Sequence, residues 1–272
     1  MNIREAIEKL VNRVNLSESD TVDVMNQIMT GEATPLQVAS FLTALRMKGE
    51  TVEEITGAAR VMREKAHRVN VGGKNVLDTC GTGGDQKGTF NISTTAAFVV
   101  AGAGVDVAKH GNRSVSSQSG SADVLGALGV KVDAPKERVE QCIATIGIGF
   151  LFAPLLHEAM KYAVGPRRDI GIRTIFNLLG PLTNPAMARY QLIGIYSGEL
   201  VGAIANVLKN LGSARAMVVH GLEGLDEISL CGPTKVADLR DGVVKEYQLE
   251  PEQVGLRRCQ LADLHGGSAA ES

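Results

Sequence analysis

Aromatic residues and one-sided charge are both scarce in this 272-residue sequence. It contains 6 Phe, 4 Tyr and no Trp, which leaves few flat side chains on which nucleic-acid bases could stack. The 28 basic and 30 acidic residues give a formal charge of -2, so no global positive field attracts a polyanion. The composition therefore argues against a nucleic-acid partner, and any bound phosphate must be held by local groups.

Long apolar runs and paired cysteines are also lacking. The most apolar stretch, residues 96–105, is too short to span a membrane, and the amino-terminal residues lack the apolar core of a signal peptide. Cys80, Cys142, Cys231 and Cys259 are far apart in the sequence and form no C-x-x-C motif. We therefore expect a reduced, cytoplasmic protein with no membrane partner.

Glycine, in contrast, is abundant. The sequence has 31 glycines in 272 residues, about 11%, compared with a usual share of roughly 7%. No internal repeat accounts for them, so they belong to turns and to loops that approach a ligand closely. With 44% hydrophobic residues, the chain can also bury a full core.

The apolar pattern predicts two kinds of structure. Up to about Arg68, apolar residues recur at helical spacing, and signals such as the capping box of Thr51 and Glu54 separate short helices. After Gly73, short β-like segments alternate with helices, which is typical of βαβ units around a mostly parallel sheet. We predict strands at residues 76–79, 105–108, 131–133, 149–153, 190–196 and 216–219, and a hairpin at Asp241 and Gly242.

The predicted fold class is α/β, with a small amino-terminal helical domain and a larger α/β domain around a mostly parallel central sheet. Helical spacing returns between Pro154 and Pro185, so these helices can join the amino-terminal ones. The expected domains are residues 1–70, joined by helices from 155–187, and residues 71–154 together with 188–272. Because residues 265–272 are polar, glycine-rich and without a closing element, we expect the second domain to be incomplete at its carboxyl end.

The first candidate site is the segment DTCGTGGDQKGTFNISTT at residues 78–95, between a predicted strand and a predicted helix. Its glycines allow backbone N–H groups to face an anion, and Asn91, Ser93 and Thr94 add donors at the positive end of the helix. The segment is neither a dinucleotide fingerprint nor a P-loop, because both patterns need glycine where Gln86 stands. A phosphate site is the favoured interpretation, and an ordinary glycine-rich turn is the alternative.

The second candidate site is KHGNRSVSS at residues 109–117, which follows the predicted strand at 105–108. The carboxyl ends of neighbouring parallel strands open onto one crevice, so we expect this loop and the glycine-rich segment to face the same ligand. Lys109 and Arg113 supply positive charge, and the serines supply hydroxyl groups. Taken alone, the segment could also be a solvated polar loop.

Two charged pairs complete the candidates. Asp226 and Glu227 follow the predicted strand at 216–219, and two carboxylates beside a polyphosphate are typical of a Mg²⁺ site. Arg167 and Arg168 could hold a carboxylate. Taken alone, each pair could be a solvated surface feature. Because no nucleophile elbow and no zinc-spaced histidines are present, the sequence favours catalysis by positioning, metal and electrostatics over covalent catalysis.

Five segments, in this order, resemble the anthranilate phosphoribosyltransferase family: GTGGD at 81–85, NIST at 91–94, KHGNRSVSS at 109–117, GPR at 165–167 and the pair Asp226 and Glu227. The resemblance covers nearly the whole chain and implies a fold like that of nucleoside phosphorylases and these phosphoribosyltransferases. It also implies a homodimer formed through the helical domains. Members of the family continue well past the position of Gly267.

The activity implied by this resemblance is that of a glycosyltransferase of the pentosyltransferase type, in tryptophan biosynthesis. Such an enzyme transfers the phosphoribosyl group of phosphoribosyl pyrophosphate to the amine of anthranilate, gives N-(5-phosphoribosyl)anthranilate and pyrophosphate, and uses Mg²⁺ as its cofactor. Anthranilate carries an amine that is already nucleophilic, so the resemblance assigns no residue as an acid or a base. Domain closure over a hinge would exclude water from the activated sugar.

The residue roles that the resemblance implies fall into three groups. Gly81, Asn112 and Arg167 would contact anthranilate, with the arginine facing its carboxylate and His110 lining that pocket. Ser93, Asp226 and Glu227 would contact magnesium, and Lys109, His110 and Arg167 would line the catalytic site. Phosphoribosyl pyrophosphate would be held by Gly81, Gly84, Asp85, Thr89, Asn91, Ile92, Ser93, Thr94, Lys109, His110, Gly111, Asn112, Arg113, Ser114, Val115, Ser116, Ser117 and Ser121.

Other functions stay open at this point. A pyrimidine nucleoside phosphorylase of similar fold would bind inorganic phosphate and a nucleoside, but Asp226 and Glu227 favour a magnesium pyrophosphate substrate instead. A nucleic-acid-binding homologue would need a basic surface, which a charge of -2 does not offer. A dinucleotide dehydrogenase is excluded by Gln86.

Overall fold

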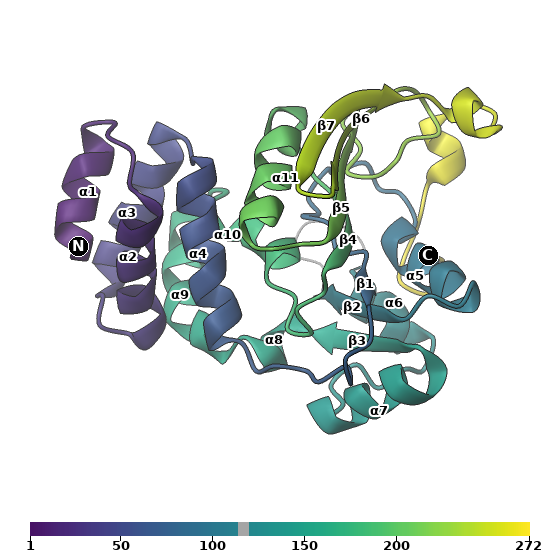
Figure 1. The fold of residues 1–272 in the computed structure, drawn as a ribbon, viewed down its shortest axis with the longest axis horizontal. Coiled ribbons are helices and arrows are strands. Elements are labelled where there is room, and N and C mark those ends of the chain that lie inside the picture. The colour runs from purple at the N-terminus through teal and green to yellow at the C-terminus, as the bar shows by residue number, and fades with distance from the viewer. Residues whose placement is uncertain (114–119) are drawn as a thin grey trace. The chain divides into compact units, whose positions relative to one another are not determined.

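A computed structural model describes residues 1–113 and 120–272 of the chain. Contacts within the chain divide them into two units (Figure 1). We call residues 1–67 with 156–183 the helical unit, and residues 68–155 with 184–272 the α/β unit. The polypeptide therefore passes from the helical unit into the α/β unit, returns to the helical unit and then completes the α/β unit.

The helical unit forms because short amphipathic helices begin at strong capping residues. Ser17, Thr34 and Thr51 each accept a backbone N–H of the first turn of their helix. The capping box of Thr51 and Glu54 is confirmed. Glu54 is fully buried and also accepts the N–H of Leu16 at 2.9 Å. The helices are α1 (Ile3–Val11), α2 (Glu18–Thr30), α3 (Pro35–Lys48), α4 (Val52–Lys65), η1 (Glu158–Met160), α9 (Lys161–Ile170), α10 (Phe176–Leu179) and η2 (Gly180–Leu182), and α8 (Ala153–Leu156) lies at the boundary between the two units.

The α/β unit is built on a seven-stranded sheet in the order β3-β2-β1-β4-β5-β6-β7. The first five strands in this order are parallel to one another, and β6 and β7 form an antiparallel hairpin at one edge, as predicted (Figure 1). The strands are β1 (Leu77–Asp78), β2 (Val107–Gly111), β3 (Ile148–Phe152), β4 (Tyr190–Gly194), β5 (Arg215–Gly221), β6 (Thr234–Arg240) and β7 (Val243–Leu249).

Helices pack against this sheet through its apolar side chains. Val107, Leu151, Ile193 and Val218, one from each of four of the five parallel strands, are fully buried. Burial of such side chains contributes roughly 1.5–3 kcal/mol each. Contacts join α5 to β2 and β3, α7 to β3, and α11 to β5, β6 and β7. The helices are α5 (Ile92–Gly102), α6 (Ser121–Ala127), α7 (Lys136–Ile146), η3 (Gly198–Leu200), α11 (Val201–Asn210), η4 (Pro251–Val254) and η5 (Leu261–Leu264).

One predicted strand is wrong: residues 131–133 form a turn. The three residues lie in the short connection between the end of α6 and Pro135, which precedes α7. Val132 is buried against Ala122 and Leu125, and this packing accounts for its apolar side chain. A single buried valine in a loop therefore produced the β-like pattern.

The membrane prediction can be examined on the helices themselves. Within residues 1–113 and 120–272, no helix has both the length and the apolar character that crossing a membrane requires.

Candidate active site

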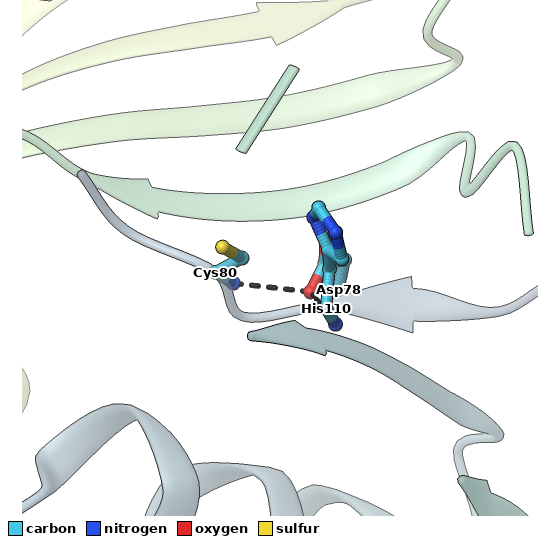
Figure 2. A group of neighbouring side chains, drawn as sticks. All are labelled: Asp78, Cys80 and His110. Carbon is cyan, nitrogen blue, oxygen red and sulfur yellow. Dashed lines mark hydrogen bonds between the residues drawn. The ribbon is translucent and has the colours of Figure 1, made fainter. Parts of the chain in front are cut away.

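The carboxylate of Asp78, at the end of β1, joins two loops of the α/β unit (Figure 2). Its Oδ1 atom accepts the backbone N–H of Cys80 at 3.1 Å, where the glycine-rich segment begins. The same oxygen accepts the backbone N–H of His110 at 3.0 Å, on the neighbouring strand β2. The two candidate phosphate segments therefore begin side by side, as the sequence predicts for neighbouring parallel strands.

The environment of Asp78 is fully buried and polar. Burial raises the pKa of Asp78 to about 6, while Asn184, Lys109 and the two backbone N–H groups oppose this increase. The amide of Asn184 donates to the carbonyl of Ala108 at 2.8 Å, which links the segment before β4 to β2. Asp78 is thus an acceptor that orients backbone groups and is not placed as an exposed catalytic acid.

Asp78, Cys80 and His110 bring three potential metal-ligand atoms within 4.8 Å of one another (Figure 2). Their chemistry does not fit magnesium, which prefers oxygen ligands and keeps several waters. Burial also raises the pKa of the Cys80 thiol, and a thiol must lose its proton to bind a metal. The Oδ1 atom of Asp78 is already used by two backbone donors. We therefore assign this group to orientation of the loops.

Lys109 follows Ala108 on β2 and is buried at the same edge of the sheet. Its Nζ atom donates to the hydroxyl of Thr79 at 3.2 Å and to that of Ser93 at 3.2 Å. Burial lowers the pKa of Lys109, whereas Cys80, Asp78 and Glu227 raise it. The lysine thus places a cationic group between the end of β1 and the first turn of α5.

The amino-terminal end of α5 lies at this position because Asn91 caps the helix. The Oδ1 atom of Asn91 accepts the backbone N–H of Thr94 at 3.1 Å. Gly83, Gly84 and Gly88 have positive φ angles of 65°, 84° and 68°, which turn the backbone in a way that side chains with a Cβ atom resist. The turns of the loop thus lead directly into the positive end of α5, an arrangement that favours an anion.

Asp226 and Glu227 follow β5, and a third carboxylate, Asp85, joins them from the glycine-rich segment. The backbone N–H of Asp226 donates to Oδ2 of Asp85 at 3.4 Å. Burial, together with the charges of Asp85 and Glu227, raises the pKa of Asp226. Burial also raises the pKa of Glu227 to about 7, although Lys109 opposes the increase. Three carboxyl groups in a partly buried cluster of this kind favour a bound cation.

Gly194, at the end of β4, allows the carboxylate loop to approach the sheet. A Cβ atom at position 194 would collide with the backbone carbonyl of Asp226. The carbonyl of Gly194 also accepts the N–H of Thr82 at 2.9 Å, and a Cβ atom at Gly81 would lie 2.9 Å from it. Close backbone packing at this glycine therefore brings the glycine-rich segment and the carboxylate loop together.

Most of the predicted phosphate-site residues lie at the carboxyl ends of the parallel strands, but some of them have other partners. The Arg113 guanidinium forms an ion pair with Asp123 at 3.0 Å and lies over the ring of Phe152. Thr89 forms an isolated β-bridge with His265. The remaining described residues lie between β1 and α5, on or directly after β2, or in the first turns of α5 and α6. They are Gly81, Gly84, Asp85, Asn91, Ile92, Ser93, Thr94, Lys109, His110, Gly111, Asn112 and Ser121.

Four predicted residues are not described by the structure, and a fifth belongs to the helical unit. Ser114, Val115, Ser116 and Ser117 lie outside the described residues. Arg167 belongs to α9 of the helical unit, where its guanidinium lies 5.2 Å from the centre of the Phe176 ring. Burial lowers the pKa of Arg167.

Three residues that organise the carboxyl ends of these strands are absent from the predicted site. One is Asp78, for which the sequence does hold a signal: a carboxylate at a strand end, directly before a loop, can accept backbone N–H groups. Asn184 and Gly194 act through contacts across the sheet, and no local pattern predicts such contacts. The role of Asp85 as part of the carboxylate cluster was also missed.

The donor set at this edge fits magnesium in chemical terms. Asp226 and Glu227 supply carboxylate oxygens, and the hydroxyl of Ser93 lies at the adjacent start of α5. One or two carboxylates, completed by waters and substrate phosphates, are the usual protein share of a Mg²⁺ site. The raised pKa values of the two carboxyl groups show an excess of buried negative charge that a cation would relieve.

We expect the protein in a metal chelator to lose stability as the pH rises from about 4.5 to 7. Glu227 has an ordinary pKa of 4.5 and a folded pKa of about 7, so the folded state binds more protons across this window. Stability is therefore fully present below the lower pKa and falls as the pH rises, by up to roughly 3 kcal/mol for this group.

Urea unfolding at several pH values measures this loss. The double variant Asp226→Asn, Glu227→Gln should have a flatter profile than the original chain, whereas Asp241→Asn, at an exposed position, should not. Parallel profiles for the double variant and the original chain would contradict the assignment.

Comparison with known proteins identifies the chain's family. The glycosyl transferase family, helical bundle domain, matches residues 4–66, and the glycosyl transferase family, a/b domain, matches residues 73–272. The anthranilate phosphoribosyltransferase of Geotalea uraniireducens is 58% identical over 98% of this chain and 81% of its own length. That of Syntrophotalea carbinolica is 59% identical over 98% of this chain and 80% of its own length.

Solved structures give the same result. The crystal structure of anthranilate phosphoribosyltransferase from Thermus thermophilus is 47% identical, with a TM-score of 0.92 over 98% of this chain and 79% of its own. The enzyme from Saccharomyces cerevisiae in complex with PRPP and Mg is 32% identical, with a TM-score of 0.88 over 99% of this chain and 78% of its own. From its sequence, its fold and these relatives, the chain belongs to the anthranilate phosphoribosyltransferase family.

Proposed function

We propose that this protein transfers the phosphoribosyl group from phosphoribosyl pyrophosphate to the amine of anthranilate, giving N-(5-phosphoribosyl)anthranilate and pyrophosphate in tryptophan biosynthesis. The observation that carries the proposal is the convergence of three loops at one edge of the sheet. These are the glycine-rich segment after β1, the carboxyl end of β2 with the residues that follow it, and the loop that contains Asp226 and Glu227. Membership in the family supplies the substrates that fit this arrangement.

Phosphoribosyl pyrophosphate carries several negative charges, and the proposed site meets them with fixed positive groups. The backbone N–H groups of the glycine-rich segment and the amino-terminal end of α5 would face the pyrophosphate. Lys109 lies beside that helix end, where its ammonium group is held by Thr79 and Ser93. These groups are ordered before the substrate arrives, so little reorganisation is needed during the reaction.

Magnesium completes the proposal as a cofactor, with Ser93, Asp226 and Glu227 as the residues that would hold it together with the pyrophosphate. When bound, Mg²⁺ would neutralise negative charge on the departing pyrophosphate. Asp226 and Glu227 would then be held ionised, because a nearby cation opposes the increase in their pKa values that burial causes.

The chemistry needs positioning more than a strong base. The bond between the sugar carbon and the pyrophosphate oxygen breaks as the anthranilate nitrogen forms its bond to the same carbon, and the nitrogen then loses a proton. Positive charge develops on the sugar during this step. The carboxylates of Asp85, Asp226 and Glu227 lie on the side where the phosphates would bind. Among the described residues we therefore assign none as an acid or a base.

The proposed contacts to anthranilate are Gly81, Asn112 and Arg167, with His110 lining its pocket. Gly81 and Asn112 lie in the loops that follow β1 and β2. Arg167 would face the carboxylate of anthranilate, since a guanidinium forms two parallel hydrogen bonds with a carboxylate. Its position over Phe176 supports its orientation.

We further propose that two copies associate through the helical unit and that the protein is cytoplasmic. Leu36 and Met47 lie three turns apart on one side of α3, and 81% and 71% of their surfaces are exposed. Two such exposed apolar side chains on one helix face support a contact between copies. The four free cysteines support a reducing compartment.

The transfer reaction can be followed by the loss of anthranilate fluorescence. We expect a decay that requires the protein, phosphoribosyl pyrophosphate and Mg²⁺ together, and that disappears in the double variant Asp226→Ala, Glu227→Ala. The control Asp241→Ala removes a carboxylate that is 93% exposed and should keep the activity. A flat signal with all components present, with phosphorolysis of pyrimidine nucleosides instead, would replace the proposal with a nucleoside phosphorylase.

Arg167→Ala should weaken the use of anthranilate by about 2–4 kcal/mol in kcat/KM, because one partner of a charge-assisted pair is lost. Binding of phosphoribosyl pyrophosphate should not change. Arg168→Ala is the matched control, because the side chain of Arg168 is 80% exposed and lies beside Asp169. Steady-state kinetics with each substrate varied in turn distinguish the two effects, and unchanged anthranilate kinetics in Arg167→Ala would remove it from the site.

Sedimentation velocity tests the association of copies. The double variant Leu36→Glu, Met47→Glu should sediment as a monomer, because charged side chains would be buried in the contact. Val243→Glu, at an exposed position on β7 of the α/β unit, should leave the dimer intact. A dimer that survives the changes in α3 would place the contact elsewhere.

A further inference from the structure

Cys231 and Cys259 lie next to each other although 28 positions separate them in the sequence. Cys231 belongs to the loop between β5 and β6, and Cys259 follows η4. The backbone N–H of Cys259 donates to the carbonyl of Leu230, the residue before Cys231, at 3.1 Å. The two thiols lie close enough for Cys259 to raise the pKa of the Cys231 thiol, and both residues are free and partly exposed.

This geometry suits a disulfide. Disulfides join residues whose Cα atoms lie roughly 4.4–6.8 Å apart, and the hydrogen bond from Cys259 to Leu230 holds the two backbone segments together at the positions of the pair. The other two cysteines have different surroundings: Cys80 lies against Asp78 and His110, and Cys142 belongs to α7. Among the four cysteines, the pair at 231 and 259 is therefore the one that the described structure brings into thiol contact.

Both segments that carry the pair also reach the proposed active site. The loop before Cys231 contains Asp226 and Glu227. The segment after Cys259 contacts the glycine-rich segment, because the N–H of Phe90 donates to the carbonyl of Leu264 at 3.0 Å and the N–H of Gly266 donates to the carbonyl of Gly88 at 2.8 Å. A bond between the two sulfur atoms would connect the carboxylate loop to a segment that already holds the glycine-rich segment.

We propose that Cys231 and Cys259 form an intramolecular disulfide on exposure to low-molecular-weight disulfides, and that this bond slows the enzyme reversibly. Neither thiol lies among the residues proposed to touch substrate. The slowing rests on the proposed function, since pyrophosphate can enter and leave only if the loops around it move.

The exchange is balanced in thiols and disulfides. The sulfur of Cys259 attacks one sulfur of oxidised glutathione, and one glutathione leaves as a thiol while a mixed disulfide forms. The sulfur of Cys231 then attacks the Cys259 sulfur of that mixed disulfide, and the second glutathione leaves. One disulfide bond is broken and one is formed, the protein loses two hydrogens, and two glutathione thiols gain them.

The surroundings of Cys231 act on its thiol. Burial, followed by the neighbouring Cys259, raises the pKa of the Cys231 thiol, Glu223 adds to the increase, and Ser229 opposes it. Whichever of the two thiols attacks the small disulfide first, the other resolves the mixed disulfide to the same product.

The test is a titration of the full chain with oxidised glutathione, read by intact mass and by the count of free thiols. The original chain and the control variant Cys142→Ser should each lose two hydrogens and two thiols and retain no glutathione. Cys231→Ser should instead retain one glutathione on Cys259, because the resolving thiol is gone. Four free thiols in the titrated original chain, or a stable glutathione on both cysteines, would overturn the proposal.

The effect on the enzyme is measured separately from the bond. Oxidised original chain should show a lower kcat that returns when a reductant is added, whereas Cys231→Ser and Cys259→Ser should keep their rates in both conditions. A disulfide without any change in kcat would overturn the proposed slowing. An inactive reduced chain that still forms the disulfide would count against the transferase activity and leave the bond itself established.

Discussion

One buried carboxylate sets the positions of both phosphate-facing loops. Asp78 accepts backbone N–H groups from Cys80 and His110, at the starts of two segments that follow neighbouring strands (Figure 2). Burying a carboxyl group is costly, and the two backbone donors to Oδ1 together with the nearby Lys109 offset part of that cost. Because the loops share one acceptor atom, neither can shift without disturbing the other. The donors of the proposed pyrophosphate site are thereby ordered in advance.

The rest of the edge depends on close backbone approach and on opposing charges. Gly194 leaves space for the carbonyl of Asp226, which brings the carboxylate loop against the sheet beside the glycine-rich segment. This packing concentrates negative charge at Asp85, Asp226 and Glu227, and the buried ammonium of Lys109 lies close enough to oppose the increase in the pKa of Glu227. Negative and positive groups are thus held on adjacent parts of one edge, as transfer from a metal-bound pyrophosphate requires.

Local signals in the sequence predicted the parts of the fold that local physics determines. The capping box of Thr51 and Glu54 and the hairpin at Asp241 are confirmed because each depends on neighbours within a few residues. The strand at 131–133 is wrong because burial of Val132 comes from packing against α6 and not from a sheet. Contacts between distant segments were not predictable in this way, and they include the ion pair of Arg113 with Asp123 and the pairing of Thr89 with His265.

Hydrogen bonding by Asp78, more than its charge, orders the proposed phosphate site. Calorimetric binding of phosphoribosyl pyrophosphate with Mg²⁺ to Asp78→Asn and Asp78→Ala tests it, with thermal unfolding of each variant measured in parallel. An asparagine keeps an oxygen that can accept both N–H groups, so Asp78→Asn should bind nearly as tightly as the original chain. Asp78→Ala should lose about 2–4 kcal/mol of binding free energy as both loops lose their acceptor. Equal losses in the two variants, or no loss in Asp78→Ala, would contradict the claim.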